Sequence, residues 1–173
     1  MNSFYSYEEL RDLGFQSLGG KDICISRKAS IYGAENISIG DHTRVDDFCI
    51  MSGRITLGRH VHIAAHVCLY GGASGIVIED FCCISSRGAV YAISDDYSGN
   101  AMSNPTVPAK YRLVKEESVY VGKHALIGTG CTVLPGVTIG EGASVGAMSL
   151  INRDLEPWTM NVGIPCRKLK ERS

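Results

Sequence analysis

Histidines and aspartates are the residues of this sequence best suited to acid–base chemistry. The chain contains five histidines, and imidazole exchanges a proton near neutral pH more readily than any other side chain. Asp95 and Asp96 stand together in the polar stretch SDDYSG, where a carboxylate could orient a substrate ammonium group and help to carry its proton away. A single histidine is equally consistent with a surface position, and the two aspartates with a solvated loop.

The spacing of the histidines is regular. Four of them follow an aliphatic residue by three positions, namely His42, His60, His66 and His124. His62 directly precedes an aliphatic residue, so we expect all five side chains to point outward. The candidate catalytic residues are therefore Asp95, Asp96, His62, His66 and His124. Our preferred substrate face consists of His62, His66, Arg87 and Asp95, with His124 as the second choice of base.

A repeat of six residues must position these groups. Its aliphatic position recurs without a break at Val121, Ile127, Val133, Ile139, Val145 and Ile151, and more loosely from Ile39 to Leu69. A helix face recurs every 3.6 residues and a strand face every 2, so a period of six indicates a larger repeated unit. Strands of alternating residues would not hold this phase over so many units. We therefore predict an all-β solenoid with three short strands per coil.

Three segments depart from the repeat. The stretch SYEELRDLG has the capping-box residues Ser6 and Glu9, which predict a short helix in a capping segment, residues 1–20. The solenoid is expected at 21–155 with a long loop inserted at 92–118, and a C-terminal tail at 156–173. Loops of this length are usually functional. A disordered insert is the alternative, but apolar side chains in the loop favour packing on a neighbouring subunit: Tyr97, Met102, Val107 and Tyr111.

The composition excludes several classes of protein. A net charge of −1 gives no bulk attraction for nucleic acid. No apolar run is long enough to span a membrane and no signal peptide opens the chain, so we expect a cytoplasmic protein. Three of the seven cysteines, Cys49, Cys82 and Cys131, fall on a compact inward repeat position. Without a CxxC pair, a cysteine-rich zinc site is not expected. A reactive role for Cys82 or Cys83 is the minor alternative.

The repeat resembles that of the hexapeptide-repeat acyltransferases over roughly residues 20–170. The segment VGIPCRKLK, near the end, resembles the Gly-x-Pro-(Ala or Cys) ending of sugar acetyltransferases in that family. The resemblance implies a left-handed parallel β-helix, a homotrimer with active sites between subunits, and acetyl-coenzyme A as the donor. It also implies residues for that donor. These are Gly128, Gly146 and Ala147 beside the pantetheine arm, with exposed N–H groups for the thioester carbonyl, and Pro165, Arg167, Lys168 and Lys170 in the tail.

Longer stretches resemble a subgroup of galactoside and lipopolysaccharide acetyltransferases, among them RVDDFCIMSG and SDDYSGNAM. That subgroup includes an enzyme acting on dTDP-4-amino-4,6-dideoxyglucose. Relatives that acetylate a hydroxyl supply a histidine from the extruded loop, whereas this loop contains aspartates and no histidine. An amine is the easier nucleophile, because it titrates near pH 8. The resemblance therefore implies an N-acetyltransferase for a nucleotide-linked amino sugar in O-antigen or polysaccharide biosynthesis, with substrate contacts from Arg87, Tyr70, Tyr97 and Asn104.

Two other functions remain open from the sequence. The first is O-acetylation of a glycan or galactoside, with a histidine as general base. The second is zinc chemistry, because carbonic-anhydrase-like members of the same solenoid class bind zinc through three histidines. The acetyltransferase-like tail would then be unexplained, so we expect no metal site.

Overall fold

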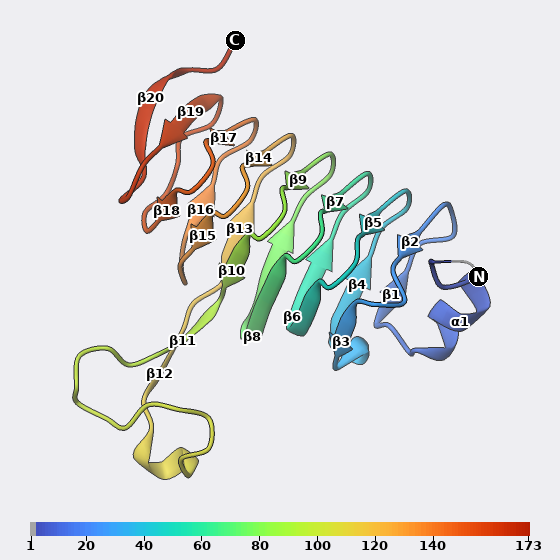
Figure 1. The fold of residues 1–173 in the computed structure, drawn as a ribbon, viewed down its shortest axis with the longest axis horizontal. Helices are drawn as coiled ribbons and strands as arrows, with labels where there is room; N and C mark the ends of the chain where they lie inside the picture. Colours follow the sequence, from blue (N-terminus) through green and yellow to red (C-terminus); the bar gives the residue numbers. More distant parts are fainter. Residues whose placement is uncertain (1–2) are drawn as a thin grey trace.

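The structure is a computed structural model that describes residues 3–173, most of which form one parallel β-solenoid (Figure 1). The short strands stack in three ladders, which we call faces 1, 2 and 3. Face 1 contains β2 (Cys24–Ile25), β5 (Arg44–Val45), β7 (His62–Ile63), β9 (Cys83–Ile84), β14 (Leu126–Ile127), β17 (Ser144–Val145) and β19 (Thr159–Val162).

Faces 2 and 3 share two long strands, β6 (Ile50–Leu57) and β8 (Cys68–Ile78), which continue from one face into the other. The rest of face 2 consists of β3 (Ser30–Tyr32), β10 (Ala89–Tyr91), β15 (Thr132–Val133) and β18 (Leu150–Ile151). The rest of face 3 consists of β1 (Ser17–Leu18), β4 (Ile37–Ile39), β13 (Val119–Val121) and β16 (Thr138–Ile139). A 3-10 turn, η1 (Ala34–Asn36), precedes β4.

The six-residue register predicted from the sequence is confirmed by the pairing. Val45 pairs with Ile63, 18 residues later, and Ile63 pairs with Ile84. All three side chains are fully buried, and each buried aliphatic side chain contributes about 1.5–3 kcal/mol to folding. The predicted inward cysteines Cys49, Cys82 and Cys131 are also buried. The core is therefore a continuous stack of small aliphatic side chains enclosed by the three faces.

The edges of the solenoid hold residues in the left-handed backbone region. At the edge between faces 3 and 1, four stacked rings and a fifth, tilted ring form what we call the aromatic column: His42, His60, Phe81, His124 and Trp158. Successive ring centroids are 4.6, 5.0, 5.1 and 6.4 Å apart. Each of these residues has a φ between 54° and 62°. The edge between faces 1 and 2 has a second column with the same backbone, which includes Phe48, His66, Arg87 and Met148.

A short helix lies at the N-terminal end of the solenoid, beside β1 and β2 (Figure 1). This helix, α1 (Tyr7–Asp12), has the capping box expected from the sequence, because Ser6 and Glu9 each bond the backbone N–H of the other. Leu10 is fully buried in the core. The helix therefore covers hydrophobic core that the first coil would otherwise expose.

The long loop leaves the solenoid after face 2 and returns to face 3, and it projects far from the body (Figure 1). Its stem pairs β11 (Ile93–Asp95) with β12 (Val114–Glu116) in antiparallel fashion, and η2 (Ala109–Tyr111) lies near its far end. The stem packs against β8 at Gly72, where an added Cβ would lie 3.0 Å from Ile93 Cβ. Gly72 thus allows the loop to emerge close to the body.

The C-terminal end is closed by a hairpin. β20 (Arg167–Glu171) turns back along β19 and pairs with it in antiparallel fashion at the end of the face 1 ladder. Cys166 is fully buried beneath this turn. No helix within residues 3–173 is long and apolar enough to cross a membrane.

The close spacing of coils at the edge glycines is testable by substitution. A Cβ at position 40 would lie 2.5 Å from Gly58 O, so Gly40→Ala should reduce the free energy of unfolding by about 1–3 kcal/mol. Denaturant midpoints measure this effect. Gly20→Ala is the matched control, because nothing lies within 4 Å of its Cβ. Equal midpoints for the two variants would contradict the register described here.

Candidate active site

A thiol, an imidazole and a carboxylate meet on the outer surface of face 1. His62 Nε2 lies 2.8 Å from Asp46 Oδ2, and His62 Nδ1 lies 3.8 Å from Cys83 Sγ. Arg44 Nε donates to the other oxygen of Asp46 at 2.6 Å. These residues come from three successive coils, β5, β7 and β9, which the parallel register places side by side. The carboxylate fixes the ring orientation of His62.

The electrostatics of this cluster follow from partial burial and from its hydrogen bonds. Partial burial alone would raise the pKa of Asp46, but the hydrogen bonds from His62 and Arg44 outweigh it and hold that pKa below its ordinary value. Asp46 is therefore ionised at neutral pH. Burial raises the pKa of the Cys83 thiol, and the negative charge of Asp46 adds to the effect. Cys83 therefore stays protonated unless a base removes its proton.

Beside this cluster a row of outward positions, one per coil, runs along face 1. Its members follow the inward aliphatic residue, and each N–H donates to the next coil: Asp46, Ala64, Ser85, Gly128 and Gly146. Gly128 and Gly146 were predicted beside the pantetheine arm. Ser85 was not selected from the sequence, although its repeat position is the same as that of the two glycines. The structure thus places the predicted donor glycines on the same face as His62.

The free backbone donors are not those that the sequence analysis expected. The N–H groups of Gly128 and Gly146 donate to Val145 O and Asn161 O at 2.9 and 2.8 Å, so the expectation that they are exposed was wrong for these two. Their missing side chains instead allow a close approach of the next coil, since an added Cβ would lie 2.7 Å from Ala147 N at Gly128 and 2.7 Å from Val162 Cγ1 at Gly146. One position further along, the amide of Ala147 donates to no acceptor within residues 3–173, and neither do those of Ala65, Ser86 and Thr129. A row of free donors therefore lies beside the glycines.

The adjoining edge carries two of the predicted site residues. His66 and Arg87 occupy the same edge position on successive coils, since Arg87 N donates to Ala65 O. The His66 ring stacks on Phe48 with centroids 5.0 Å apart. The exposed Arg87 guanidinium has no ion pair or hydrogen bond within the described chain. Arg87 is therefore available to an anionic ligand beside the free amides.

His124 lies elsewhere. It belongs to the aromatic column at the edge between faces 3 and 1, with its ring between those of Phe81 and Trp158. His42 and His60 belong to the same column, with Phe81 inserted between His60 and His124. Stacking accounts for these three histidines. In one chain the edge of His124 is separate from the edge of His66 and Arg87.

The loop holds the two aspartates in different ways. Asp96 accepts hydrogen bonds from the N–H groups of Ser98 at 2.9 Å and Asn100 at 3.1 Å, and the Ser98 interaction is the main cause of its lowered pKa. The carboxylate of Asp95 has no such partner among the described residues. Asp96 shapes the turn, whereas Asp95 is free to meet a ligand.

A groove of about 890 Å³ lies between the loop stem and face 2. Loop residues on one side and face 2 residues on the other line it, including Asp95, Tyr97, Leu113, Leu134 and Leu150. Tyr91, which also lines the groove, stacks on Tyr70 with centroids 5.1 Å apart, and burial raises the pKa of Tyr70 to about 12. Asn104 lies outside the groove and accepts from Thr106 N.

The predicted substrate face is therefore divided within one chain. His62, His66 and Arg87 lie on face 1 or its edge with face 2, whereas Asp95 extends from the opposite edge of face 2. Within a single subunit Asp95 does not meet the other three side chains, because face 2 lies between them.

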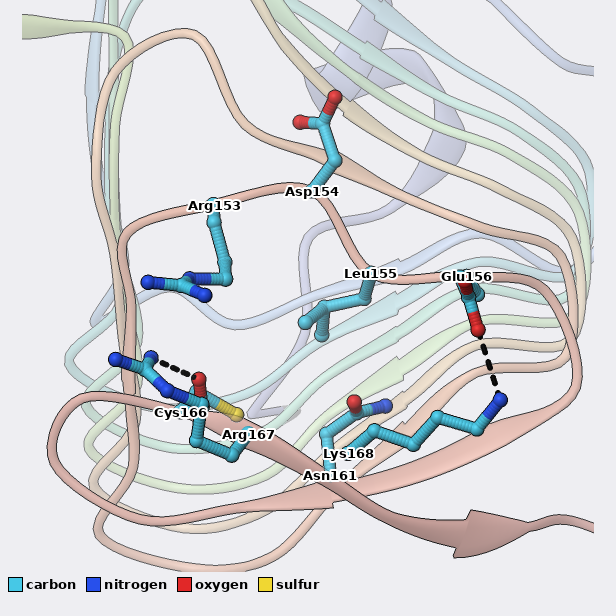
Figure 2. A pocket seen from close by; sticks show the side chains of 8 residues that line it. All are labelled: Arg153, Asp154, Leu155, Glu156, Asn161, Cys166, Arg167 and Lys168. Carbon is cyan, nitrogen blue, oxygen red and sulfur yellow. Dashed lines mark hydrogen bonds and ion pairs between the residues drawn. The ribbon is translucent and has the colours of Figure 1, made fainter.

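A smaller pocket of about 380 Å³ lies at the C-terminal end (Figure 2). Figure 2 shows the guanidinium groups of Arg153 and Arg167 on one side of it and the Lys168–Glu156 ion pair on the other. Lys168 also pairs with Glu171 at 2.6 Å, so its charge is already balanced. Arg153 was not selected from the sequence, yet it supplies the second uncompensated guanidinium here. Pro165 and Lys170 do not line the pocket.

The histidines form no metal site in the part of the chain that the structure describes. No group of three or more histidine, cysteine, aspartate or glutamate side chains between residues 3 and 173 is arranged to bind a metal ion.

Known proteins share both the sequence pattern and the fold. Residues 118–153 match the family described as bacterial transferase hexapeptide (six repeats). The chain is 45% identical to the dTDP-4-amino-4,6-dideoxy-D-glucose acyltransferase of Escherichia coli over 168 residues, which cover 95% of this chain and 86% of that protein. The match confirms the predicted type of enzyme, an acyltransferase.

Solved structures of AntD, an N-acyltransferase from Bacillus cereus, are also similar. One, with dTDP-4-amino-4,6-dideoxyglucose and coenzyme A bound, superposes with a TM-score of 0.97 at 51% identity, covering 100% of this chain and 92% of AntD. Another, with dTDP and 3-hydroxybutyryl-coenzyme A, gives a TM-score of 0.96 at 52% identity over the same shares. These matches confirm the predicted left-handed parallel β-helix and the use of an acyl-coenzyme A co-substrate.

The different roles of the two loop aspartates can be tested by proteolysis. Asp96→Ala removes the acceptor for two loop N–H groups. The free energy of loop opening should therefore fall by about 1 kcal/mol, so that the open loop is populated roughly five-fold more often. Trypsin cleavage after Lys110, which is exposed, reports this opening. Asp95→Ala is the control and should cleave at the wild-type rate. Faster cleavage in both variants would assign a structural role to Asp95 as well.

Proposed function

Because this chain belongs to the hexapeptide-repeat acyltransferases, we propose that it transfers an acetyl group from acetyl-coenzyme A to the amino group of a dTDP-linked 4-amino-4,6-dideoxy sugar. The observation that carries the proposal is the similarity over nearly the whole chain to enzymes acting on, or binding, that sugar nucleotide. The product would serve O-antigen or another polysaccharide. Seven free cysteines fit a reducing cytoplasmic location.

The donor would lie along face 1 and the edge that follows it. Gly128 and Gly146 would lie beside the pantetheine arm, and the free amide of Ala147 would donate to the thioester carbonyl. Negative charge builds on that oxygen during acyl transfer, and a fixed N–H donor stabilises it. At the C-terminal end, Arg153 and Arg167 would receive phosphate oxygens, because guanidinium groups match phosphate geometry. Lys168, already paired, would contribute little.

Asp95 would bind the amino group of the sugar. Two solved AntD variants replace a serine and an aspartate that are ten positions apart. Here the same spacing separates Ser85 from Asp95 and Ser86 from Asp96. Asp96 is engaged in the loop turn, so we favour Ser85 and Asp95. Asp95 would hold the ammonium group and orient the neutral amine once its proton is lost.

The chemistry then needs only a weak base. The amine nitrogen attacks the thioester carbonyl, its surplus proton passes to the departing sulfur, and free coenzyme A and the amide leave. A thiolate with a pKa near 8.5 can take that proton. The absence of a histidine from the loop sequence is therefore consistent with an amine acceptor.

Ser85 and Asp95 lie on different sides of one chain, so the proposal requires the site to form between subunits of a trimer. The groove under the loop supports this arrangement, because Leu134 and Leu150 line it. Exposed apolar side chains of the loop, including Tyr97 at 93% and Met102 at 57% exposure, add to this surface. A neighbouring subunit would bring its face 1 to Asp95, and Arg87, Tyr97 and Tyr70 would surround the sugar nucleotide.

One observation favours a second candidate, O-acetylation of a glycan or galactoside. His62 is held by Asp46 on the donor face, and a histidine oriented by a carboxylate is the usual base for activating a hydroxyl. His66 lacks such a partner within the described residues.

Acceptor preference distinguishes the two candidates. We expect thiol release from acetyl-coenzyme A with dTDP-4-amino-4,6-dideoxyglucose and none above background with its 4-hydroxy counterpart or simple galactosides. Comparing acetyl- with 3-hydroxybutyryl-coenzyme A in the same assay defines the acyl group. Turnover of the hydroxyl acceptor alone would reject the amino-sugar proposal. His62→Gln would then be expected to lower the rate by about 10²-fold or more.

The site between subunits predicts complementation. Asp95→Asn should lower kcat, and an Arg153→Glu/Arg167→Glu variant should weaken donor binding. When the two are co-expressed, about a quarter of the sites should combine an intact loop with an intact donor surface. Activity recovered above that of either variant supports shared sites, with sedimentation reporting the trimer. No recovery from mixed trimers would place each site within one chain.

A further inference from the structure

Cys83 has an environment that no other cysteine in residues 3–173 shares. Its Sγ faces His62 Nδ1 at 3.8 Å, and Asp46 holds the other ring nitrogen. Four cysteines are buried: Cys49, Cys82, Cys131 and Cys166. Cys24 and Cys68 are half-buried like Cys83 but have no histidine partner among the described residues. Nucleophile, base and orienting carboxylate are the three parts of an activated thiol.

The geometry also decides which nitrogen of His62 could act as the base. Because Asp46 is ionised, His62 Nε2 carries the proton that the carboxylate accepts, and Nδ1 is left with a free lone pair. Nδ1 is the nitrogen that faces the thiol. Since burial raises the pKa of Cys83, the thiol depends on this imidazole for deprotonation. His62 remains 43% exposed, so small electrophiles can approach the pair.

Cys83 is also close to the proposed donor. It projects from the same side of the strand as Ser85, about 7 Å away along the backbone. Ser85 N–H donates to Ile127 O, which places Gly128 on the adjacent coil beside it. A thioester lying along Gly128 and Gly146 would therefore have Cys83 within reach of its flexible end.

We propose that Cys83 is an acyl-accepting thiol, which the acyl-coenzyme A donor acylates when no sugar amine is bound. The inference rests on the proposed function, because it uses the donor surface described above. His62 Nδ1 takes the thiol proton as sulfur attacks the acyl carbonyl. The bond from the carbonyl carbon to the coenzyme sulfur breaks, and the imidazolium returns the proton to the leaving thiolate. The products are an acyl-Cys83 thioester and free coenzyme A.

Exchange between two thioesters changes the free energy little, so the reaction is reversible. The acylated fraction would follow the ratio of acyl-coenzyme A to free coenzyme A. Cys83 would thereby record the supply of donor on the face where the donor binds.

The test is to incubate the full chain with acetyl-coenzyme A and no acceptor, quench in acid, and map acetylated cysteines by peptide mass spectrometry. We expect acetylation of Cys83, and none of Cys24, which occupies the same repeat position three coils away, or of Cys68. His62→Gln should slow the reaction by about 10²-fold. His60→Gln is the matched control, since His60 stacks on His42 and Phe81 at another edge and does not contact the thiol.

A pH profile separates activation from a merely structural effect. In His62→Gln the remaining rate should rise only at alkaline pH, toward the raised pKa of the buried thiol. Wild-type acylation should already be fast near neutral pH. The acylation rate of Asp46→Asn should lie between the rates of the wild type and His62→Gln, because the His62 ring loses the carboxylate that orients it. Unfolding midpoints of the variants show whether the fold is retained, and Cys83→Ser should abolish the adduct.

The same samples, given the amino-sugar nucleotide, separate this inference from the proposed function. Sugar acetylation without a Cys83 adduct overturns the inference and leaves the function standing. An acetyl-Cys83 adduct without sugar acetylation supports the inference and rejects the amino-sugar nucleotide as the acceptor. Equal labelling of Cys24 and Cys68, or an unchanged rate in His62→Gln, overturns the inference, and absence of both reactions overturns both.

Discussion

In this solenoid each coil is joined by backbone hydrogen bonds to the coils before and after it in the stack. Arg44 N, for example, donates to Val61 O, and His62 N to Cys82 O. Because the strands pair in parallel and in register, a residue must face the same direction as its counterpart in the next coil. Val45, Ile63 and Ile84 consequently stack in the core, and a slip of one residue would turn all of them outward. The buried stack and the hydrogen-bond ladder therefore fix each other.

The same constraint orders the outer surface. Outward positions also stack, so residues about 20 positions apart in sequence become neighbours on a face. This is how Asp46, His62 and Cys83 come within hydrogen-bonding distance, and how Ser85, Gly128 and Gly146 form one row. The insertion of a long loop between faces 2 and 3 does not disturb the ladder, because Val119 resumes pairing with β8. A long loop can therefore be inserted between two coils without shifting the pairing of their strands.

Residues of the same type can nevertheless serve different purposes. His60 and His124 share a left-handed edge conformation and stack in the aromatic column, whereas His62 lies on a flat face and contacts a carboxylate. Asp95 and Asp96 differ in the same way: one accepts loop amides and the other does not. What distinguishes such residues is the partner within reach, and the partner belongs to another coil or, in our proposal, to another subunit.

The sequence by itself determined the solenoid, the inward residues, the capped helix and the position of the loop. These features follow from periodicity and local hydrogen bonding, which depend only on residues that are close together in the sequence. It also indicated Gly128 and Gly146 through resemblance. Only the tertiary structure decided that their N–H groups are already bonded while that of Ala147 is free. Likewise, it decided that Arg153 joins Arg167, that Lys168 is neutralised, and that face 2 separates Asp95 from His62. The physical reason is that charge balance and free donors depend on residues of other coils, whose offsets in the sequence are changed by the long loop.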